Sequence, residues 1–188
     1  MALGFQELPQ LESDYGKVGM QKVITTVGNV VSDQTNNRFI KLSNDGSYIN
    51  SCSIAMNNIG AVKYVDDNSI FVAVTGDNKV YKLKSNNNTD ASWISDDLPS
   101  GAAPSGLVYS SNTKRLYVVS AANKKIYVLD GQTGKLLYSF GKSGSTPHQG
   151  QFTSPCAAAI CGSNGTSDLY ISDTDGNCIV RFRSGVSW

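Results

Sequence analysis

Short β-rich runs alternate with polar turns along the chain, and four of them share one pattern. They begin at positions 39, 80, 126 and 179: Phe39-Ile40-Lys41-Leu42, Val80-Tyr81-Lys82-Leu83, Ile126-Tyr127-Val128-Leu129 and Ile179-Val180-Arg181-Phe182. Each run follows another β-rich run at a constant offset, across a polar link that contains an asparagine. The earlier runs are residues 30–32, 71–73, 117–119 and 170–172, and the asparagines are Asn37, Asn78, Asn123 and Asn177. The pattern predicts the same β-hairpin four times.

Two further strands can be placed around these hairpins. Small or apolar inner strands are predicted before each hairpin, at residues 21–27, 60–65, 104–109 and 155–160. More polar outer strands follow the first three hairpins, at residues 47–51, 92–95 and 135–140. The hairpins start 41, 46 and 53 residues apart, and a period in the forties built of antiparallel strands is typical of β-propeller blades. We therefore predict an all-β chain, a single β-propeller domain over residues 1–188 with four-stranded antiparallel blades.

The repeats divide the chain into four blades, approximately at residues 18–53, 54–97, 98–142 and 143–188. The last blade has too few residues for an outer strand. Residues 4–8 precede the first inner strand and belong to none of the four repeats. We expect this N-terminal strand to complete the last blade, which would close the ring and remove its exposed edges. A fragment of a larger propeller, and a partial ring that closes by oligomerisation, are alternatives that fit the same repeat.

The last repeat resembles an NHL repeat of the β-propeller class. The residues that carry the resemblance are Gly141-Lys142-Ser143-Gly144, Gly150-Gln151-Phe152, Pro155, Leu169-Tyr170-Ile171-Ser172-Asp173 and Asn177-Cys178-Ile179-Val180-Arg181-Phe182. Residues 30–46 look like a second copy, whereas Val74 and Ser120 replace the Asp of the pattern in the middle two repeats. Cys178 stands where the NHL pattern has its His, and the family usually has more than four blades. The resemblance implies a propeller fold, and because the family includes lyases, RNA-binding domains and protein-interaction modules, function must be argued from the site.

Composition agrees with a strand-and-turn architecture. Ser, Gly and Asn number 24, 18 and 16, so these turn-forming types fill 58 of 188 positions, an alphabet that does not build long helices. The formal net charge is +1, which gives no general electrostatic reason to bind nucleic acid or an anionic membrane. The chain as given shows neither a secretory signal pattern nor an apolar run near the ~18 residues of a membrane span.

In a propeller, the turns between the second and third strands open on the same end as the links between blades. We call this end the loop face, and loops on a rigid scaffold commonly carry binding sites. Its candidate binding residues are Asp33, Asn37, Arg38, Asp77, Lys79, Lys124, His148, Asp173 and Asp175. Asp33 and Asp173 occupy equivalent strand ends, where Asx-type hydrogen bonds to their own hairpins are the favoured interpretation.

No catalytic residue, cofactor or metal site is predicted. The chain has no Gly-x-Ser-x-Gly elbow and no P-loop. Its single histidine, His148, cannot supply the several His ligands of the amidating lyases that resemble this family. Only Asp66 and Asp67 lie close to the predicted inner strands, so converging oxygen ligands for a cation in the channel are not expected.

Four cysteines are present, and neither a CxxC motif nor zinc-finger spacing joins them. Cys156 and Cys178 are predicted two strands apart, at ~9–10 Å between Cα atoms, which is too far for a disulfide. Small buried apolar side chains are the favoured interpretation of the four.

The favoured hypothesis is a non-enzymatic binding or scaffold propeller whose loop face contacts a protein or glycan partner. One alternative is a lactonase- or lyase-like enzyme with a metal in the channel. Others are a single-stranded RNA-binding propeller and a structural assembly subunit. RNA binding is disfavoured because Asp33, Asp77, Asp173 and Asp175 would offset the basic residues of the loop face.

Overall fold

The structure, a computed structural model, describes residues 30–33, 35–43, 45–53, 56–65, 69–84, 91–146, 149–161 and 168–183. The regular structure of these residues is β-strand, without an α-helix. The first sheet consists of β1 (Val30–Asp33), β2 (Arg38–Leu42) and β3 (Tyr48–Ser53). The second consists of β4 (Ile59–Val65), β5 (Ser69–Val74), β6 (Lys79–Lys84) and β7 (Ala91–Ile94).

The third sheet consists of β8 (Gly106–Ser110), β9 (Arg115–Ser120), β10 (Lys125–Asp130) and β11 (Leu136–Phe140). The fourth consists of β14 (Pro155–Cys161), β15 (Asp168–Asp173) and β16 (Cys178–Phe182). Within each sheet the strands follow one another in sequence order, and neighbouring strands are antiparallel. These sheets confirm the predicted hairpins, the three later inner strands and the three outer strands. The inner strand predicted at residues 21–27 and the closing strand at residues 4–8 lie outside the described residues.

The four hairpins between second and third strands have one common register. The residue pairs that flank their turns are Asp33 with Arg38, Val74 with Lys79, Ser120 with Lys125, and Asp173 with Cys178. The last turn residue always has a positive φ: 48° at Asn37, 57° at Asn78, 54° at Lys124 and 49° at Asn177. Asparagine adopts this left-handed conformation more readily than other non-glycine residues. This conformation explains the recurring asparagine at the first, second and fourth turns. At the third turn, Lys124 takes the same conformation.

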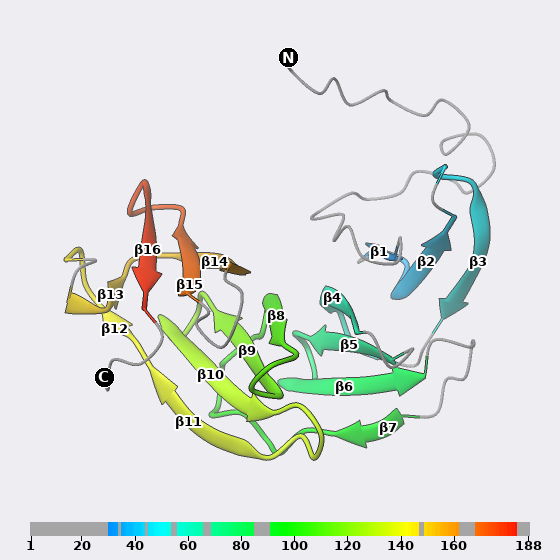
Figure 1. Cartoon of the computed structure of the whole chain (residues 1–188), viewed down its shortest axis with the longest axis horizontal. Helices are drawn as coiled ribbons and strands as arrows, with labels where there is room; N and C mark the ends of the chain where they lie inside the picture. Colours follow the sequence, from blue (N-terminus) through cyan, green and yellow to red (C-terminus); the bar gives the residue numbers. More distant parts are fainter. Residues whose placement is uncertain are drawn as a thin grey trace.

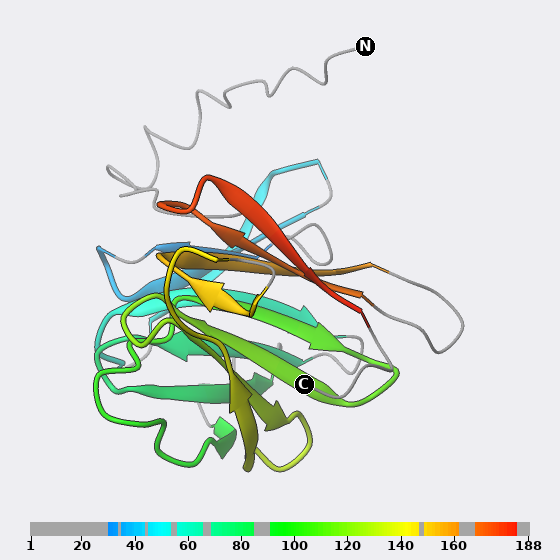
Figure 2. The same ribbon diagram turned by 90° about the vertical axis from the view of Figure 1, so that its left-hand side faces the viewer.

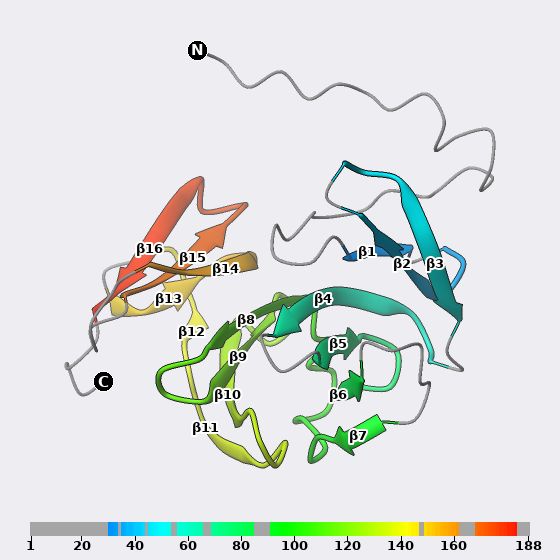
Figure 3. The same ribbon diagram turned by 45° about the vertical axis from the view of Figure 1, so that its right-hand side comes forward.

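Successive sheets pack face to face around an arc (Figure 1), with β4, β8 and β14 nearest its centre and β3, β7 and β11 at its periphery. One apolar cluster joins each consecutive pair of sheets: Phe39 contributes to the first, Phe71 to the second and Ile126 to the third. The arc leaves the first and fourth sheets at its two ends (Figure 3). A side view shows the strands running between two ends of the molecule where the turns collect (Figure 2).

Glycines allow the inner strands to approach backbone to backbone. A Cβ atom on Gly60 would lie 2.8 Å from the carbonyl oxygen of Pro104, and one on Gly106 would lie 2.7 Å from that of Cys156. These distances are shorter than any ordinary Cβ contact, so only glycine fits without a shift of the neighbouring strand. The small residues predicted near the centre therefore set the spacing of adjacent sheets.

The link between the third and fourth sheets contains a short parallel pair that the sequence pattern did not reveal. It is formed by β12 (Lys142–Ser143) and β13 (Gln151–Phe152). The Phe152 side chain is fully buried in the cluster between the third and fourth sheets, with its ring centroid 6.0 Å from that of Phe182. The Gly-Gln-Phe motif thus anchors this link in the core.

Candidate functional site

The turns between second and third strands lie against links that enter a sheet, as expected for the loop face. The link belongs either to the next sheet or to the sheet of the turn itself. The Asn58 N–H donates to the Asn37 side-chain oxygen at 2.9 Å, which ties the first turn to the entry of β4. The Thr174 N–H donates to the Ser154 carbonyl at 2.9 Å, which ties the fourth turn to the entry of β14. The first and fourth turns are therefore each joined by a hydrogen bond to a link that enters a sheet.

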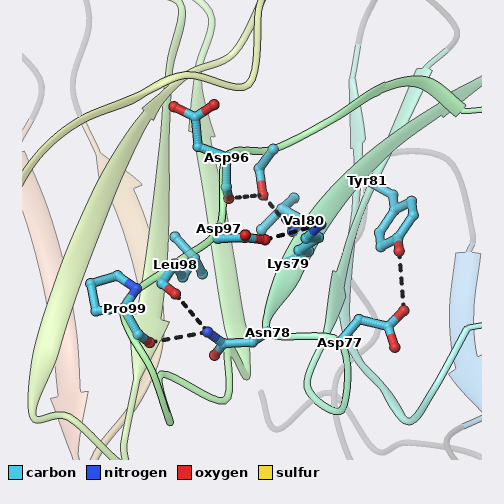
Figure 4. Close-up of polar contacts among 10 residues, drawn as sticks. Asp77, Asn78, Lys79, Val80, Tyr81, Asp96, Asp97, Leu98 and Pro99 are labelled. Carbon is cyan, nitrogen blue, oxygen red and sulfur yellow. Dashed lines mark hydrogen bonds and ion pairs between the residues drawn. The ribbon is translucent and has the colours of Figure 1, made fainter.

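The most extensive of these junctions surrounds Asn78, the last residue of the second turn (Figure 4). Its side-chain amide donates to the carbonyl oxygens of Leu98 at 2.7 Å and Pro99 at 3.0 Å. Its side-chain oxygen accepts the N–H of Ala103 at 3.0 Å. One side chain thus satisfies three backbone groups of the link between the second and third sheets, a segment that would otherwise have to bond to water.

Two charged candidates lie beside Asn78. The Lys79 ammonium is 3.0 Å from a carboxylate oxygen of Asp97, whose side chain is 82% exposed (Figure 4). The hydrogen bond and charge of Asp97 raise the pKa of Lys79. The Tyr81 hydroxyl donates to the Asp77 carboxylate at 3.1 Å, and the pKa of Tyr81 is raised by burial and by this carboxylate. Lys79 and Asp77 each have a partner but remain partly exposed.

Asp33 is oriented inward, with no exposed surface. Its carboxylate accepts hydrogen bonds from the Asn36 side chain at 2.8 Å, the Asn36 N–H at 3.3 Å and the Arg38 guanidinium at 2.8 Å. Burial alone would raise the pKa of Asp33, but the bonds from Asn36 and Arg38 outweigh it, and the pKa is lowered. A buried carboxylate that keeps its charge needs such partners.

Asp173, at the equivalent position of the fourth sheet, is also buried. It accepts the backbone N–H groups of Thr153 at 2.8 Å, Ser154 at 2.6 Å and Gly176 at 3.3 Å. In the third sheet, Ser120 accepts the N–H of Asn123 at 3.0 Å and donates to a carbonyl of the preceding link. The Asx-type interpretation of Asp33 and Asp173 is confirmed, and the sequence analysis missed that Ser120 has the same role.

The remaining candidates are distributed over separate turns. Lys124 is partly exposed at the third turn, and Asp175 is exposed at the fourth. His148 lies outside the described residues. The described candidates are therefore distributed over four turns of the loop face, one in each sheet. Asp33 and Arg38 lie together at the first turn, and Asp77 and Lys79 lie together at the second.

The sequence did not identify Asn78 as a contact residue. Its alignment with Asn37, a candidate binding residue, was the signal that could have done so. Ser95 was expected on the loop face as part of the link at residues 95–97, but its contacts were not predicted: its hydroxyl accepts the Val80 N–H at 2.9 Å and donates to the Asp96 carbonyl at 2.9 Å. Its signal was weak, because one serine among 24 stands out only when the link is known to turn there.

No group of three or more His, Cys, Asp or Glu side chains among the described residues is arranged to hold a metal ion. Cys156, Cys161 and Cys178 are free thiols, and β15 lies between the strands of Cys156 and Cys178 as expected. Cys161 is exposed and the other two are partly exposed, so the predicted burial is wrong for these three cysteines. No helix in the described part of the chain is long and apolar enough to cross a membrane.

Comparison with solved structures returns β-propellers that include lyases and a WD40 domain. A catalytically inactive variant of virginiamycin B lyase from Staphylococcus aureus with quinupristin aligns with a TM-score of 0.63 and 18% identity, over 84% of this chain and 49% of that one. A streptogramin B lyase gives 0.65 and 16%, over 85% and 49%. The WD40 β-propeller domain of Doa1 gives 0.57 and 15%, over 81% and 48%. The fold is a β-propeller.

At these identities the similarity shows the fold of the propeller and not its activity. The chain spans about half the length of the propellers that it matches. No protein-family model matches the sequence, and no curated protein matches it.

Proposed function

We propose that this propeller is a non-enzymatic binding module whose loop face contacts a protein or glycan partner. The observation that carries the proposal is the junction at Asn78, which holds the link at residues 98–103 through three hydrogen bonds. A loop that is already fixed loses little conformational entropy when it binds, and this preorganisation favours affinity. Loops presented by a rigid scaffold are also where binding residues concentrate.

The groups left exposed on this surface suit a polar partner. Asp97 and Asp175 present carboxylates, and Lys79 and Lys124 are partly exposed at neighbouring turns. Both signs of charge occur on the loop face, so no single-sign field favours an anionic polymer such as RNA. Polar groups of mixed charge are compatible with the rim of a protein interface or with sugar hydroxyls.

Within the propeller fold, we propose membership of the NHL-repeat class. Two residues of the pattern have physical roles that support it: Phe152 of the Gly-Gln-Phe motif fills the core, and Asp173 caps the last turn. Val74 and Ser120 replace the aspartate of the pattern in the middle two repeats. Ser120 still caps its turn by accepting the Asn123 N–H.

The proposal can be tested by selecting ligands and mapping where they bind. A peptide display library and a glycan array are screened with the whole chain. Each ligand is then measured by calorimetry against a loop-face variant, Ala122→Lys with Thr174→Lys, in which both sites are exposed turn residues. The matched control, Asn112→Lys with Gln132→Lys, adds the same charge at exposed turns on the opposite end.

We expect selected ligands to bind the loop-face variant at least ~10-fold more weakly, a loss of ~1.4 kcal/mol, and to bind the control unchanged. Ligands that bind the loop-face variant as well as the wild type, or a screen without any saturable ligand, would overturn the proposal.

A further inference from the structure

Aspartate is followed directly by glycine at three places in this chain: Asp45-Gly46, Asp130-Gly131 and Asp175-Gly176. Such a pair is chemically reactive, because glycine has no side chain to shield its backbone nitrogen, and this nitrogen can attack the carboxyl group of the preceding aspartate. Each pair lies at a turn of a different sheet. The surroundings of the three pairs differ, and the reactivity expected of them differs accordingly.

Both reacting groups of the first pair are engaged in hydrogen bonds. The Asp45 carboxylate accepts the Ser43 hydroxyl and, at 3.0 Å, the Ser47 N–H. These bonds from Ser43 and Ser47 lower the pKa of Asp45, so the carboxyl stays charged, and a charged carboxylate resists attack by a nitrogen. The Gly46 N–H donates to the Ser43 carbonyl at 3.0 Å. The first pair is therefore protected.

The second pair is protected in the same way. The Asp130 carboxylate accepts the N–H groups of Gln132 at 2.8 Å and Thr133 at 2.9 Å. The bonds from Thr133 and Gln132 lower the pKa of Asp130. The Gly131 N–H donates to the Lys114 carbonyl at 2.8 Å, and Gly131 is itself buried.

The third pair lies in the turn between β15 and β16, on the loop face, and is held less firmly. Asp175 is exposed, and within the described part of the chain its carboxylate forms no hydrogen bond or ion pair. The Gly176 N–H donates to the Asp173 carboxylate at 3.3 Å, which exceeds the usual length of an N–H···O bond. The described residues therefore leave the Asp175 carboxyl unrestrained beside the glycine nitrogen.

The buried Asp173 explains why glycine follows Asp175. A Cβ atom on Gly176 would lie 2.8 Å from both Cγ and Oδ2 of Asp173, so the carboxylate that caps this turn excludes a side chain there. The equivalent position of the other three turns is held by Asn36, Asp77 and Asn123. The reactive pair is thus a consequence of the way in which the fourth turn is capped.

We propose that Asp175 is a site of spontaneous modification, at which aspartate converts to isoaspartate through a cyclic succinimide. The Gly176 nitrogen forms a bond to the Asp175 Cγ and gives its proton to solvent, while the carboxyl hydroxyl leaves and is released, with a proton, as one water molecule. Water then adds to the main-chain carbonyl carbon of Asp175 and breaks its bond to the Gly176 nitrogen. One water is lost and one is gained, and no oxidant or reductant is needed.

The product changes the shape of the fourth turn. In isoaspartate the backbone runs through Cβ and Cγ, which inserts one methylene between Asp173 and Cys178, two residues paired across the hairpin. The Asn177 N–H, which donates to the Thr174 carbonyl at 3.2 Å, cannot keep its geometry in the longer turn. The modification would therefore remodel this part of the loop face.

The test is to incubate the whole chain in mildly acidic buffer, in which more carboxyl groups are neutral. Isoaspartate is then assigned to single residues by electron-transfer fragmentation of peptides, which also separates Asp175 from Asn164-Gly165, outside the described residues. We expect Asp175 to convert at least ~10-fold faster than Asp45 or Asp130, because two hydrogen bonds must break before either of these reacts. In urea, where the hydrogen bonds are lost, the three aspartates should convert at comparable rates.

A substitution tests the protection itself. Ser43→Ala removes the hydroxyl that donates to Asp45 and should speed the conversion of Asp45 several-fold while leaving that of Asp175 unchanged, with circular dichroism to verify the fold. The proposal would be overturned by absence of isoaspartate at Asp175 in the folded chain, by equal conversion of the three aspartates, or by the same preference for Asp175 in urea. Unchanged conversion of Asp45 in Ser43→Ala would also overturn it. Neither measurement involves a ligand, so this proposal and the loop-face proposal fail independently.

Discussion

At the residue scale, the side chain at the end of each second strand determines how the following turn is held. Asp33, Ser120 and Asp173 accept backbone N–H groups of their turns with side-chain oxygens. Val74 cannot do so, and there the N–H groups of Thr75 and Gly76 donate to backbone carbonyls of the preceding link, at 2.8 Å each. The polar strand end is thus replaceable, provided that a neighbouring segment supplies the acceptor.

Asp33 should make the stability of the protein dependent on acid. Its pKa is lowered in the folded state by Asn36 and Arg38, whereas an unfolded aspartate titrates near ~3.9. The stabilising contribution is therefore present above pH ~4 and is lost as the pH falls through the folded-state value. Asp33→Asn should lower the free energy of unfolding by roughly 2 kcal/mol at pH 7, measured by urea denaturation.

The difference between wild type and Asp33→Asn should begin to narrow below pH ~4, where the carboxyl of the unfolded chain takes up a proton, and should vanish once the folded-state carboxyl is protonated at lower pH. Asp175→Asn is the control: this exposed turn residue should change stability by less than ~0.5 kcal/mol. A difference that stays constant from pH 7 to pH 3.5 would contradict the assigned role of the Asp33 charge.

At the scale of elements, the hairpins could be predicted from the sequence because each one depends on local information. Alternating apolar residues specify the strands, and asparagine supplies the left-handed residue of three turns at Asn37, Asn78 and Asn177. The parallel pair of β12 and β13 could not be predicted, since two-residue strands leave no periodicity in the sequence. The hydrogen bonds from Asn78 to residues 98–103 were equally hidden, because they join segments 20 or more residues apart.

The contribution of the Asn78 hydrogen bonds to stability can be measured separately from that of the turn conformation. Asn78→Gly retains the positive φ but removes three hydrogen bonds to the link, and should cost roughly 2 kcal/mol in the free energy of unfolding. Asn177→Gly makes the same exchange at the equivalent turn, where the side chain is exposed, and serves as the control. Hydrogen exchange of the Ala103 N–H should accelerate in Asn78→Gly alone; equal losses in the two variants would assign the effect to the turn.

At the scale of the whole molecule, the order of the sheets follows from the sequence repeat, but the number of sheets in a closed ring does not. Curvature depends on how closely neighbouring inner strands approach, which Gly60 and Gly106 set through contacts with the next sheet. Such contacts join residues distant in sequence and leave no local pattern. The loop-face candidates among the described residues lie in or beside the turns, yet Asp33 and Asp173 are buried and accept hydrogen bonds that hold these turns.

This engagement leads to a last prediction, which separates a binding module from a lactonase- or lyase-like propeller with a channel metal. A hard cation needs several converging oxygen ligands, and the Asp33 and Asp173 carboxylates already accept hydrogen bonds from the protein. We therefore expect the melting temperature to be the same after EDTA treatment and after addition of Ca²⁺, Mn²⁺ or Zn²⁺. An ion present at 100 times its dissociation constant would stabilise the fold by ~2.7 kcal/mol and raise the melting temperature of a chain this size by roughly 5–11 °C. A saturable rise of that size, reversed by EDTA, would favour the metalloenzyme over the binding module.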